Sequence, residues 1–235
     1  MAAYAYDRVQ EESQRLMDLG VPLERAQGTA VGVIKSLLTA EEVASVREMA
    51  AKFDHLPPAH PSHTVRFLHG DHQFQEQCPT IFAKLMGAVV SAARAWGVLA
   101  DATAPRVRVI EHHCYSKGGN LNEKEHFDEG SLVTIDVRLS QVGAFEGGEF
   151  KTWECSGEMR PWPLEAPGDA VLFLSHKYHS VTPLRSGTRN VLIMETWLGE
   201  TCSKSHRCLR PFGCGENEAE EEAAGFVDLL NLDDL

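Results

Sequence analysis

The segment His126-Phe127-Asp128, followed by His179 further along the chain, decides how this sequence folds. On a β-strand, residues i and i+2 point to the same side, so His126 and Asp128 can reach one metal ion while Phe127 points away and packs. Two imidazoles and one carboxylate can occupy one face of a divalent iron ion and leave the opposite face open. The third ligand must come from a distant strand brought alongside, which predicts a rolled-up β-sheet.

Further blocks surround these residues in a fixed order. They are Tyr115-Ser116-Lys117-Gly118-Gly119, Phe145-Glu146-Gly147-Gly148-Glu149-Phe150, Pro167-Gly168-Asp169-Ala170-Val171-Leu172-Phe173, and His179-Ser180-Val181-Thr182-Pro183 leading to Gly187-Thr188-Arg189. A lone His-x-Asp motif is a weak signal, but several blocks in one order are a strong one. Over residues 105–198 the sequence resembles the 2-oxoglutarate and Fe(II)-dependent dioxygenases of the prolyl 4-hydroxylase type.

The predicted fold is mainly β with flanking helices: a double-stranded β-helix, or jelly-roll barrel, buttressed by N-terminal α-helices. Short apolar runs separated by turn residues predict the strands at 107–110, 131–139, 148–153, 170–174 and 190–197. Residues 30–38 are also β-like. Helices are predicted within 1–28, from the capping box at Thr39 to about Phe53, and from Pro79 to about Gly97.

Three regions are expected along the chain: an N-terminal helical extension at 1–28, the oxygenase-like domain at 29–200 with its core at 105–198, and a Cys-containing acidic tail at 201–235. The net charge is −12. Residues 216–235 contribute eight acidic groups and no Lys or Arg, so the remainder carries −12 + 8 = −4. No basic stripe is visible, which argues against nucleic acid as a partner.

No segment has the length and apolarity of a membrane span, and the N-terminus lacks a signal-peptide pattern. We therefore expect an intracellular, soluble, cytoplasmic protein that does not bind membranes. The scattered cysteines favour reduced thiols over a disulfide framework.

For the third metal ligand, His176 and His179 compete. Only His179 has the ten-residue interval to Arg189 that the family shows, so His179 is chosen and His176 is expected at the surface or beside the ligands. By resemblance, Arg189 and Tyr115 hold the distal carboxylate of 2-oxoglutarate, since a guanidinium binds a carboxylate through two parallel hydrogen bonds. Arg185, in a predicted turn, is expected to be solvated.

The remaining candidates line the interior of the barrel. By alignment with relatives, one face of strand 131–139 looks inward, and the last strand presents its alternate residues on the same side as Arg189. The candidate lining residues are Thr134, Asp136, Arg138, Val181, Glu195 and Trp197. Asp136, Arg138 and Glu195 form either a polar network in the pocket or a solvated strand face, and both interpretations stay open.

The C-terminal region holds Cys202, His206, Cys208 and Cys214, which could bind zinc. Their spacing matches neither CxxC nor HxxxH, so zinc is disfavoured. The acidic tail, with Phe226 and several leucines, could be a short binding segment, but its composition favours a solvated tail.

The resemblance implies Fe(II), 2-oxoglutarate and O₂ as cofactor and cosubstrates, with ascorbate as a candidate reductant. The reaction would couple conversion of 2-oxoglutarate to succinate and CO₂ with hydroxylation of a substrate C–H bond. A peptidyl or free amino-acid side chain is the favoured substrate. A small-metabolite hydroxylase and a catalytically silent, cupin-like metal-binding or interaction module are the alternatives.

Overall fold

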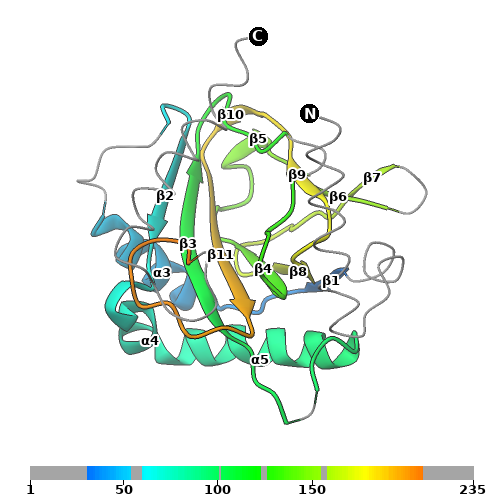
Figure 1. Cartoon of the computed structure of the whole chain (residues 1–235). Helices are drawn as coiled ribbons and strands as arrows, with labels where there is room; N and C mark the ends of the chain where they lie inside the picture. The colour runs from blue at the N-terminus through cyan, green and yellow to red at the C-terminus, as the bar shows by residue number, and fades with distance from the viewer. Residues whose placement is uncertain (1–30, 54–59, 101, 123–125, 155–157, 209–235) are drawn as a thin grey trace.

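A six-stranded antiparallel sheet forms the body of the molecule (Figure 1). The computed structural model describes residues 31–53, 60–100, 102–122, 126–154 and 158–208. The strand order is β1-β8-β4-β11-β3-β2. Their bounds are Val31–Ile34 (β1), Ala170–Leu174 (β8), Val133–Arg138 (β4), Arg189–Trp197 (β11), Arg106–Tyr115 (β3) and His63–Phe67 (β2). β11, the last strand of the described residues, pairs with β4 on one side and β3 on the other.

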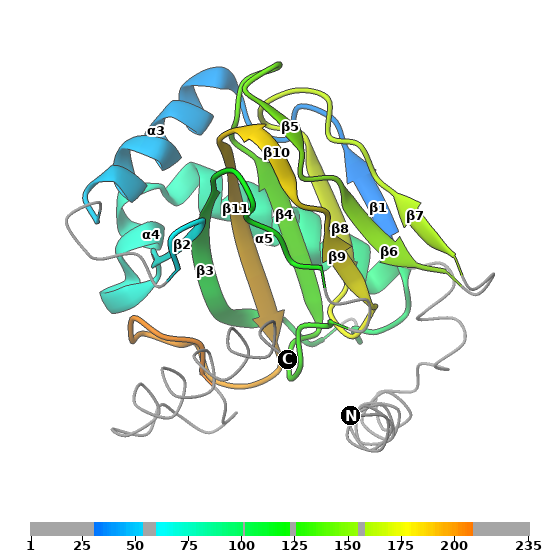
Figure 2. The ribbon, with the colours of Figure 1, turned by 90° about the horizontal axis from the view of Figure 1, so that it is seen from above.

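Two smaller antiparallel sheets cover one face of the six-stranded sheet (Figure 2). One pairs β10 (Leu184–Gly187) with β5 (Phe145–Gly147), and the other has the order β7-β6-β9. The bounds of the latter are Met159–Pro161 (β7), Phe150–Trp153 (β6) and His179–Val181 (β9). The interior between the large and the small sheets is where the predicted barrel would hold its site.

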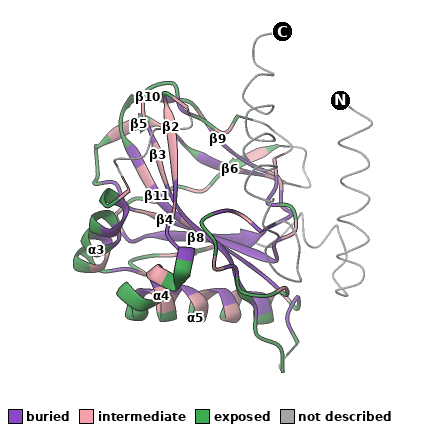
Figure 3. Ribbon diagram, turned by 60° about the vertical axis from the view of Figure 1, so that its left-hand side comes forward, coloured by how far each residue is buried: buried purple, intermediate pink, exposed green. Residues whose placement is uncertain are grey.

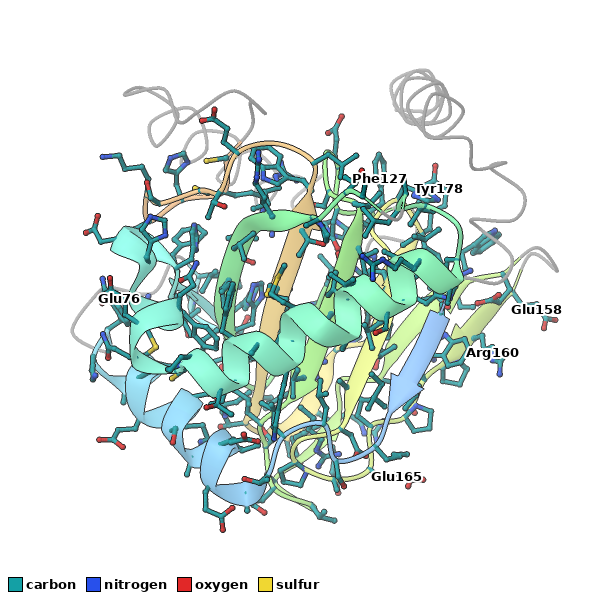
Figure 4. All side chains as sticks on the ribbon, turned by 90° about the horizontal axis from the view of Figure 1, so that it is seen from below. Glu76, Phe127, Glu158, Arg160, Glu165 and Tyr178 are labelled. Atoms are coloured by element: carbon teal, nitrogen blue, oxygen red, sulfur yellow. The ribbon has the colours of Figure 1, made fainter. Side chains whose placement is uncertain are left out.

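Helices cover the opposite face, where α5 (Pro79–Ala95) lies across the strands (Figure 4). The helix begins at a proline, whose missing N–H costs nothing in a first helical turn. Its buried residues recur at helical spacing, namely Ile81, Leu85, Val89 and Ala93. These side chains share one hydrophobic core with alternate residues of β4, and the outward faces of the helices are exposed (Figure 3).

The other helices are α3 (Ala40–Ala51), α4 (Gln73–Gln77) and the short 3₁₀ turn Gly70–His72. At the start of α3, the Thr39 side chain accepts a hydrogen bond from the Glu42 N–H, and the Glu42 carboxylate accepts one from the Thr39 N–H. The predicted capping box is therefore confirmed. None of the helices in the described ranges is long and apolar enough to cross a membrane.

The predicted strands and the two later helices are confirmed, with shifted ends, and residues 1–28 lie outside the described ranges. The sequence reading missed β2 and α4. The side chains of β2 are mostly half-buried and show no two-residue alternation in burial. The sequence therefore has no alternating apolar pattern that would have indicated this strand. The strands β5, β7, β9 and β10 are only three or four residues long, which is too short for a pattern.

Candidate metal centre

His126, Asp128 and His179 converge at one point inside the molecule. One donor atom from each lies within 4.8 Å of the other two. Asp128 Oδ1 is 3.5 Å from His126 Nε2 and 3.7 Å from His179 Nε2. Ligands about 2.1 Å from one ion and at right angles lie about 3 Å apart, so a contraction of about half an ångström would bring these atoms around an ion. The donor set of two imidazoles and one carboxylate suits non-heme iron.

The backbone between two chain segments holds this triad. The Asp128 N–H donates to the Ser175 carbonyl at 2.8 Å, and the His179 N–H donates to the His126 carbonyl at 2.9 Å. His126 and Asp128 lie just before β4 in a stretch that is not part of any strand, so their predicted placement on a strand was wrong. The backbone bonds replace a strand ladder in fixing the positions of the two side chains.

The side chain of Phe127 does point away and pack, as predicted. It is buried, and its ring centroid lies 5.8 Å from that of Tyr178 (Figure 4). The neighbouring His176 is also buried, which rules out the surface and leaves a place beside the ligands as the remaining prediction. His176 is not one of the side chains that converge with Asp128, whereas His179 is.

Hydrogen bonds orient two of the three converging side chains. Thr134 Oγ1 donates to Asp128 Oδ2 at 2.6 Å and also contacts Ser175 Oγ at 2.9 Å. His179 Nδ1 lies 3.0 Å from the Lys177 carbonyl oxygen, which can only accept, so Nδ1 carries the proton. The lone pair of His179 is then on Nε2, the nitrogen that faces Asp128.

The protonation states of these groups suit metal binding. Burial lowers the pKa of His179 to about 4. Burial alone would raise the pKa of the Asp128 carboxyl, but attraction to His179 and the hydrogen bond from His126 outweigh it and hold that pKa well below its usual range. Near neutral pH the site therefore offers a carboxylate and a neutral imidazole, which are the forms that bind metals.

A cavity of about 360 Å³ is lined by residues near the triad, although not by the three triad residues themselves. Its wall includes Arg189 at the start of β11 and Phe150 on β6, and the Phe150 ring lies 5.6 Å from the ring of His179. Arg189 is 6% exposed, which makes it a nearly desolvated cation. Burial raises the pKa of the nearby Asp136 to about 8, against the opposing effect of Arg189. Asp136 is thus mostly uncharged near neutrality and neutralises the charge of Arg189 only in part.

Tyr115 lies opposite Arg189, because the two residues are paired across β3 and β11. The guanidinium carbon of Arg189 is 5.4 Å from the centroid of the Tyr115 ring. Tyr115 is buried, and its ring stacks on that of His63 at 4.1 Å. Burial raises the pKa of the Tyr115 phenol, so it remains a hydrogen-bond donor at neutral pH.

Gly147 and Gly148, in the wall of the cavity, have positive φ angles of 80° and 62°. A Cβ atom at Gly148 would come within 2.4 Å of Leu184 Cδ1 and 3.0 Å of Arg189 Cδ. Any larger residue there would therefore push on the arginine. Asp169 accepts hydrogen bonds from the N–H groups of Ser36 and Ala166, so its carboxylate stabilises the turn before β8.

The other two arginines have different surroundings. Arg185 is exposed, as expected, although it lies on β10 and not in a turn. Arg138 lines the cavity and donates to the carbonyl oxygens of Ser140, Gln141 and Leu164. Three backbone acceptors therefore occupy the Arg138 guanidinium.

The predicted network of Asp136, Arg138 and Glu195 is not the arrangement that the structure shows. Glu195 is 1% exposed, accepts a hydrogen bond from Ser131 Oγ at 2.6 Å and pairs with Arg108 and Arg207. Register explains the difference, because Glu195 is opposite Thr134, whereas Arg138 is opposite Val191, four positions further along the pairing. The cavity wall includes Arg138 but not Glu195.

Two further candidate lining residues have other neighbours. Val181 packs with Phe150 and Phe173 in a small core beside the cavity. Trp197 packs with Cys202 and Cys208, and its indole N–H donates to the Glu200 carbonyl at 2.7 Å. The cavity wall itself includes neither residue.

Sequence reasoning missed an acidic and basic cluster on the same interior face. Arg207 Nη2 lies 3.0 Å from Glu111 Oε2 and 2.8 Å from Glu195 Oε1. Glu111 also accepts from His113 Nε2 at 2.8 Å. A charged residue within the apolar run of β3 was the available signal for Glu111, but Arg207 lies outside every recognised block and gave none.

A second group of potential ligands lies after β11, where Cys202, His206 and Cys208 converge and are all buried. The disfavoured zinc cluster therefore has a compact geometry for three of its four residues. Cys214 lies outside the described residues.

Comparisons with known proteins give one curated relative and many solved structures. No family model matches the chain. A PKHD-type hydroxylase from Idiomarina loihiensis is 38% identical over 61 residues, which are 26% of this chain and 27% of that protein. The chain thus matches about a quarter of the length of this relative.

The solved structures cover far more of the chain. A prolyl-4-hydroxylase from Pseudomonas putida superposes with a TM-score of 0.55 at 18% identity, over 73% of this chain and 94% of that one. A 2OG-Fe(II) oxygenase family oxidoreductase from Burkholderia pseudomallei gives a TM-score of 0.53 at 16% identity, over 75% and 88%. The chain has the 2-oxoglutarate–Fe(II) oxygenase fold. Another example of this fold is a Trichoplax adhaerens prolyl hydroxylase in complex with a peptide fragment, with a TM-score of 0.54, 13% identity and coverage of 80% and 92%.

Proposed function

We propose that this protein is an Fe(II)- and 2-oxoglutarate-dependent dioxygenase that hydroxylates a C–H bond. The observation that carries the proposal is the convergence of His126, Asp128 and His179, together with a cavity lined by Arg189 and by Phe150, whose ring lies 5.6 Å from that of His179. Metal triads alone occur in many proteins. A triad of this composition with a buried guanidinium in a nearby cavity wall is suited to a metal-chelating dicarboxylate.

The residues would divide the work as follows. His126, Asp128 and His179 would hold Fe(II), with Thr134 and the Lys177 carbonyl fixing the orientation of Asp128 and His179. Arg189 would bind the distal carboxylate of 2-oxoglutarate, with Tyr115 beside it. When bound, iron with 2-oxoglutarate and O₂ supplies the oxidising power for the hydroxylation, and succinate and CO₂ are released.

The chain's own contribution is to position the reactants and keep water out. Phe150, Val181 and Phe173 form an apolar wall beside His179, which limits the access of solvent to the metal. The low exposure of Arg189 strengthens its attraction for a carboxylate because the pair would form in a medium of low dielectric constant. No side chain is required as a general acid or base for transfer of a hydrogen from carbon.

The proposed architecture is a double-stranded β-helix spanning residues 29–200. The antiparallel pairing of β4, β8 and β11 opposite the small sheet of β6, β7 and β9 supports this arrangement. For the substrate we propose a peptidyl or free amino-acid side chain. The support comes from the prolyl hydroxylases among the structural neighbours, one of which binds a peptide.

The test is the formation of succinate from 2-oxoglutarate by the iron-loaded protein, followed by incubation with a panel of peptides, amino acids and small metabolites. Mass spectrometry should find the gain of one oxygen atom in a product. If only a small metabolite gains oxygen, the proposed substrate class would be wrong and the proposed reaction type would stand. If iron binds but neither succinate nor an oxygenated product forms, the protein is a silent metal-binding module instead.

A further inference from the structure

The segment that follows β11 is fixed against the body of the molecule. In Figure 1 it is the orange trace that turns back past β3. The Cys202 N–H donates to the Val107 carbonyl at 3.1 Å, and the Arg108 Nε–H donates to the Cys208 carbonyl at 2.7 Å. His69 Nε2 lies 3.1 Å from the His206 carbonyl oxygen. These contacts hold both ends and the middle of the segment in one conformation.

Three side chains of this segment gather into a buried cluster. Cys202 and Cys208 are each 1% exposed and His206 is 6% exposed. The sulfur atoms of the two cysteines lie 2.7 Å apart. One donor atom of each of the three residues lies within 4.8 Å of the other two. His206 Nδ1 is 3.2 Å from the Arg207 carbonyl, so Nδ1 carries the proton and the other ring nitrogen has the lone pair that a metal requires.

We propose that Cys202, His206 and Cys208 form a second metal site, for a zinc ion, in addition to the iron site. Two sulfur ligands and one imidazole favour zinc, whereas the carboxylate-containing triad favours iron. Zinc binding would release the protons of the two thiols to solvent, with no change in oxidation state. Water would occupy the fourth position of the tetrahedron.

The geometry requires a small adjustment. Two thiolates at about 2.3 Å from one zinc ion lie about 3.8 Å apart. The sulfur atoms of Cys202 and Cys208 must therefore separate by about 1 Å from their distance of 2.7 Å. Five residues lie between the two cysteines in the sequence, and none of these residues belongs to a helix or strand, so the loop can widen without breaking an element.

A disulfide between the same cysteines is the competing arrangement, and the third residue argues against it. A disulfide would use both sulfur atoms and no atom of His206, although this ring is buried and one of its nitrogens lies within 4.8 Å of both sulfur atoms. A shared metal ion explains why all three side chains are together.

The proposed zinc ion would also position a residue of the barrel interior. Arg207 lies between the ligands His206 and Cys208, and its side chain pairs with Glu111 on β3 and Glu195 on β11. Both carboxylates are almost fully buried. The metal would therefore hold in place the cation that neutralises two acidic groups on the interior face.

Cobalt(II) provides the test, because thiolate-bound Co²⁺ gives an intense near-ultraviolet charge-transfer band that an iron-type site without sulfur does not give. The full chain is purified reduced and free of metal, then titrated with Co²⁺. We expect the band to saturate when the thiolate site is filled, and to disappear on addition of Zn²⁺. Cys202→Ser and Cys208→Ser should each abolish it. Cys114→Ser, a half-buried cysteine on β3, is the matched control and should keep it.

Alkylation of the wild-type protein tests the same site without relying on the folding of variants. In the native protein, Zn²⁺ should protect the thiols of Cys202 and Cys208 from alkylation, as located by peptide mapping. The absence of a thiolate band from the reduced wild-type protein would overturn the proposal. So would a band that survives in folded Cys202→Ser and Cys208→Ser proteins, or peptide mapping that finds these two cysteines joined after reduction and refolding in the presence of Zn²⁺.

Discussion

The two faces of β4 have opposite roles, although they belong to the same six residues. Val133, Ile135 and Val137 face the helices and join the main hydrophobic core. Thr134 and Asp136 point into the interior between the sheets, where Thr134 bonds to Asp128 and Asp136 lies in the field of Arg189. The helix face supplies stability through apolar burial. The interior face instead carries buried polar groups that serve the proposed site. Substitutions on the helix face should therefore change stability, and substitutions on the interior face should change binding.

The largest expected effect on iron binding comes from removing a proposed metal ligand in the interior. Asp128→Ala removes the only carboxylate of the triad and leaves two imidazoles. We expect loss of stoichiometric Fe(II) binding and of succinate formation. Iron analysis after gel filtration measures the first, and thermal unfolding of the metal-free proteins serves as a control. A variant that keeps one tightly bound Fe(II) would mean that the iron ligands are elsewhere.

A substitution on the helix face of β4 should lower stability and leave iron binding unchanged. Ile135 is fully buried in the core, so Ile135→Ala should lower the free energy of unfolding by roughly 2 to 5 kcal/mol. At a temperature where the variant remains folded, its iron content per chain should match the wild type. Urea unfolding and metal analysis together check this separation. Loss of iron from a fully folded variant would show that the two faces are coupled.

Arg189 tests the interior face without touching a metal ligand. Arg189→Met should weaken binding of 2-oxoglutarate by roughly 2 kcal/mol or more, since truncating one partner of a buried charge pair costs 2 to 5 kcal/mol. This corresponds to about thirtyfold. Fe(II) binding in the absence of 2-oxoglutarate should persist.

Two other arginines serve as comparisons in the same titration. Arg185→Met should change little, because its side chain is exposed. Arg138→Met should have an intermediate effect, since this residue lines the cavity while bonded to backbone carbonyls. If Arg138→Met binds 2-oxoglutarate far more weakly and Arg189→Met binds it almost normally, the residue that binds the distal carboxylate is Arg138 on β4.

The smallest effect is expected at the C-terminus. Residues 216–235 are acidic and lie outside the matched blocks, so their deletion should leave 2-oxoglutarate decarboxylation nearly unchanged. Turnover and thermal unfolding of the truncated chain check this. A collapse of either one would make the segment part of the domain.

The sequence was sufficient where local signals agreed with the fold. The capping box at Thr39 and the apolar spacing from Pro79 predicted α3 and α5, and the alternation along 131–139 predicted β4. It failed where placement depends on tertiary contacts. Nothing local marks β2, whose side chains are mostly half-buried.

The site follows the same rule. Motif order pointed to the triad and to Arg189, because ligand types and intervals can be read from the chain. The spacing of Cys202, His206 and Cys208 argued against a cluster, yet the return of the chain past β3 brings them together. Arg207 reaches Glu111 only through this return, so no sequence pattern could have linked them.

The most direct test of the central proposal is the visible charge-transfer band of an iron–keto-acid chelate, recorded when 2-oxoglutarate is added to the Fe(II)-loaded protein without oxygen. His176 and His179 are both buried histidines three residues apart, so they form a matched pair. The proposed site predicts that the band appears in the wild type, persists in His176→Ala and is lost in His179→Ala. A band that persists in His179→Ala and is lost in His176→Ala would contradict the assignment of the metal centre.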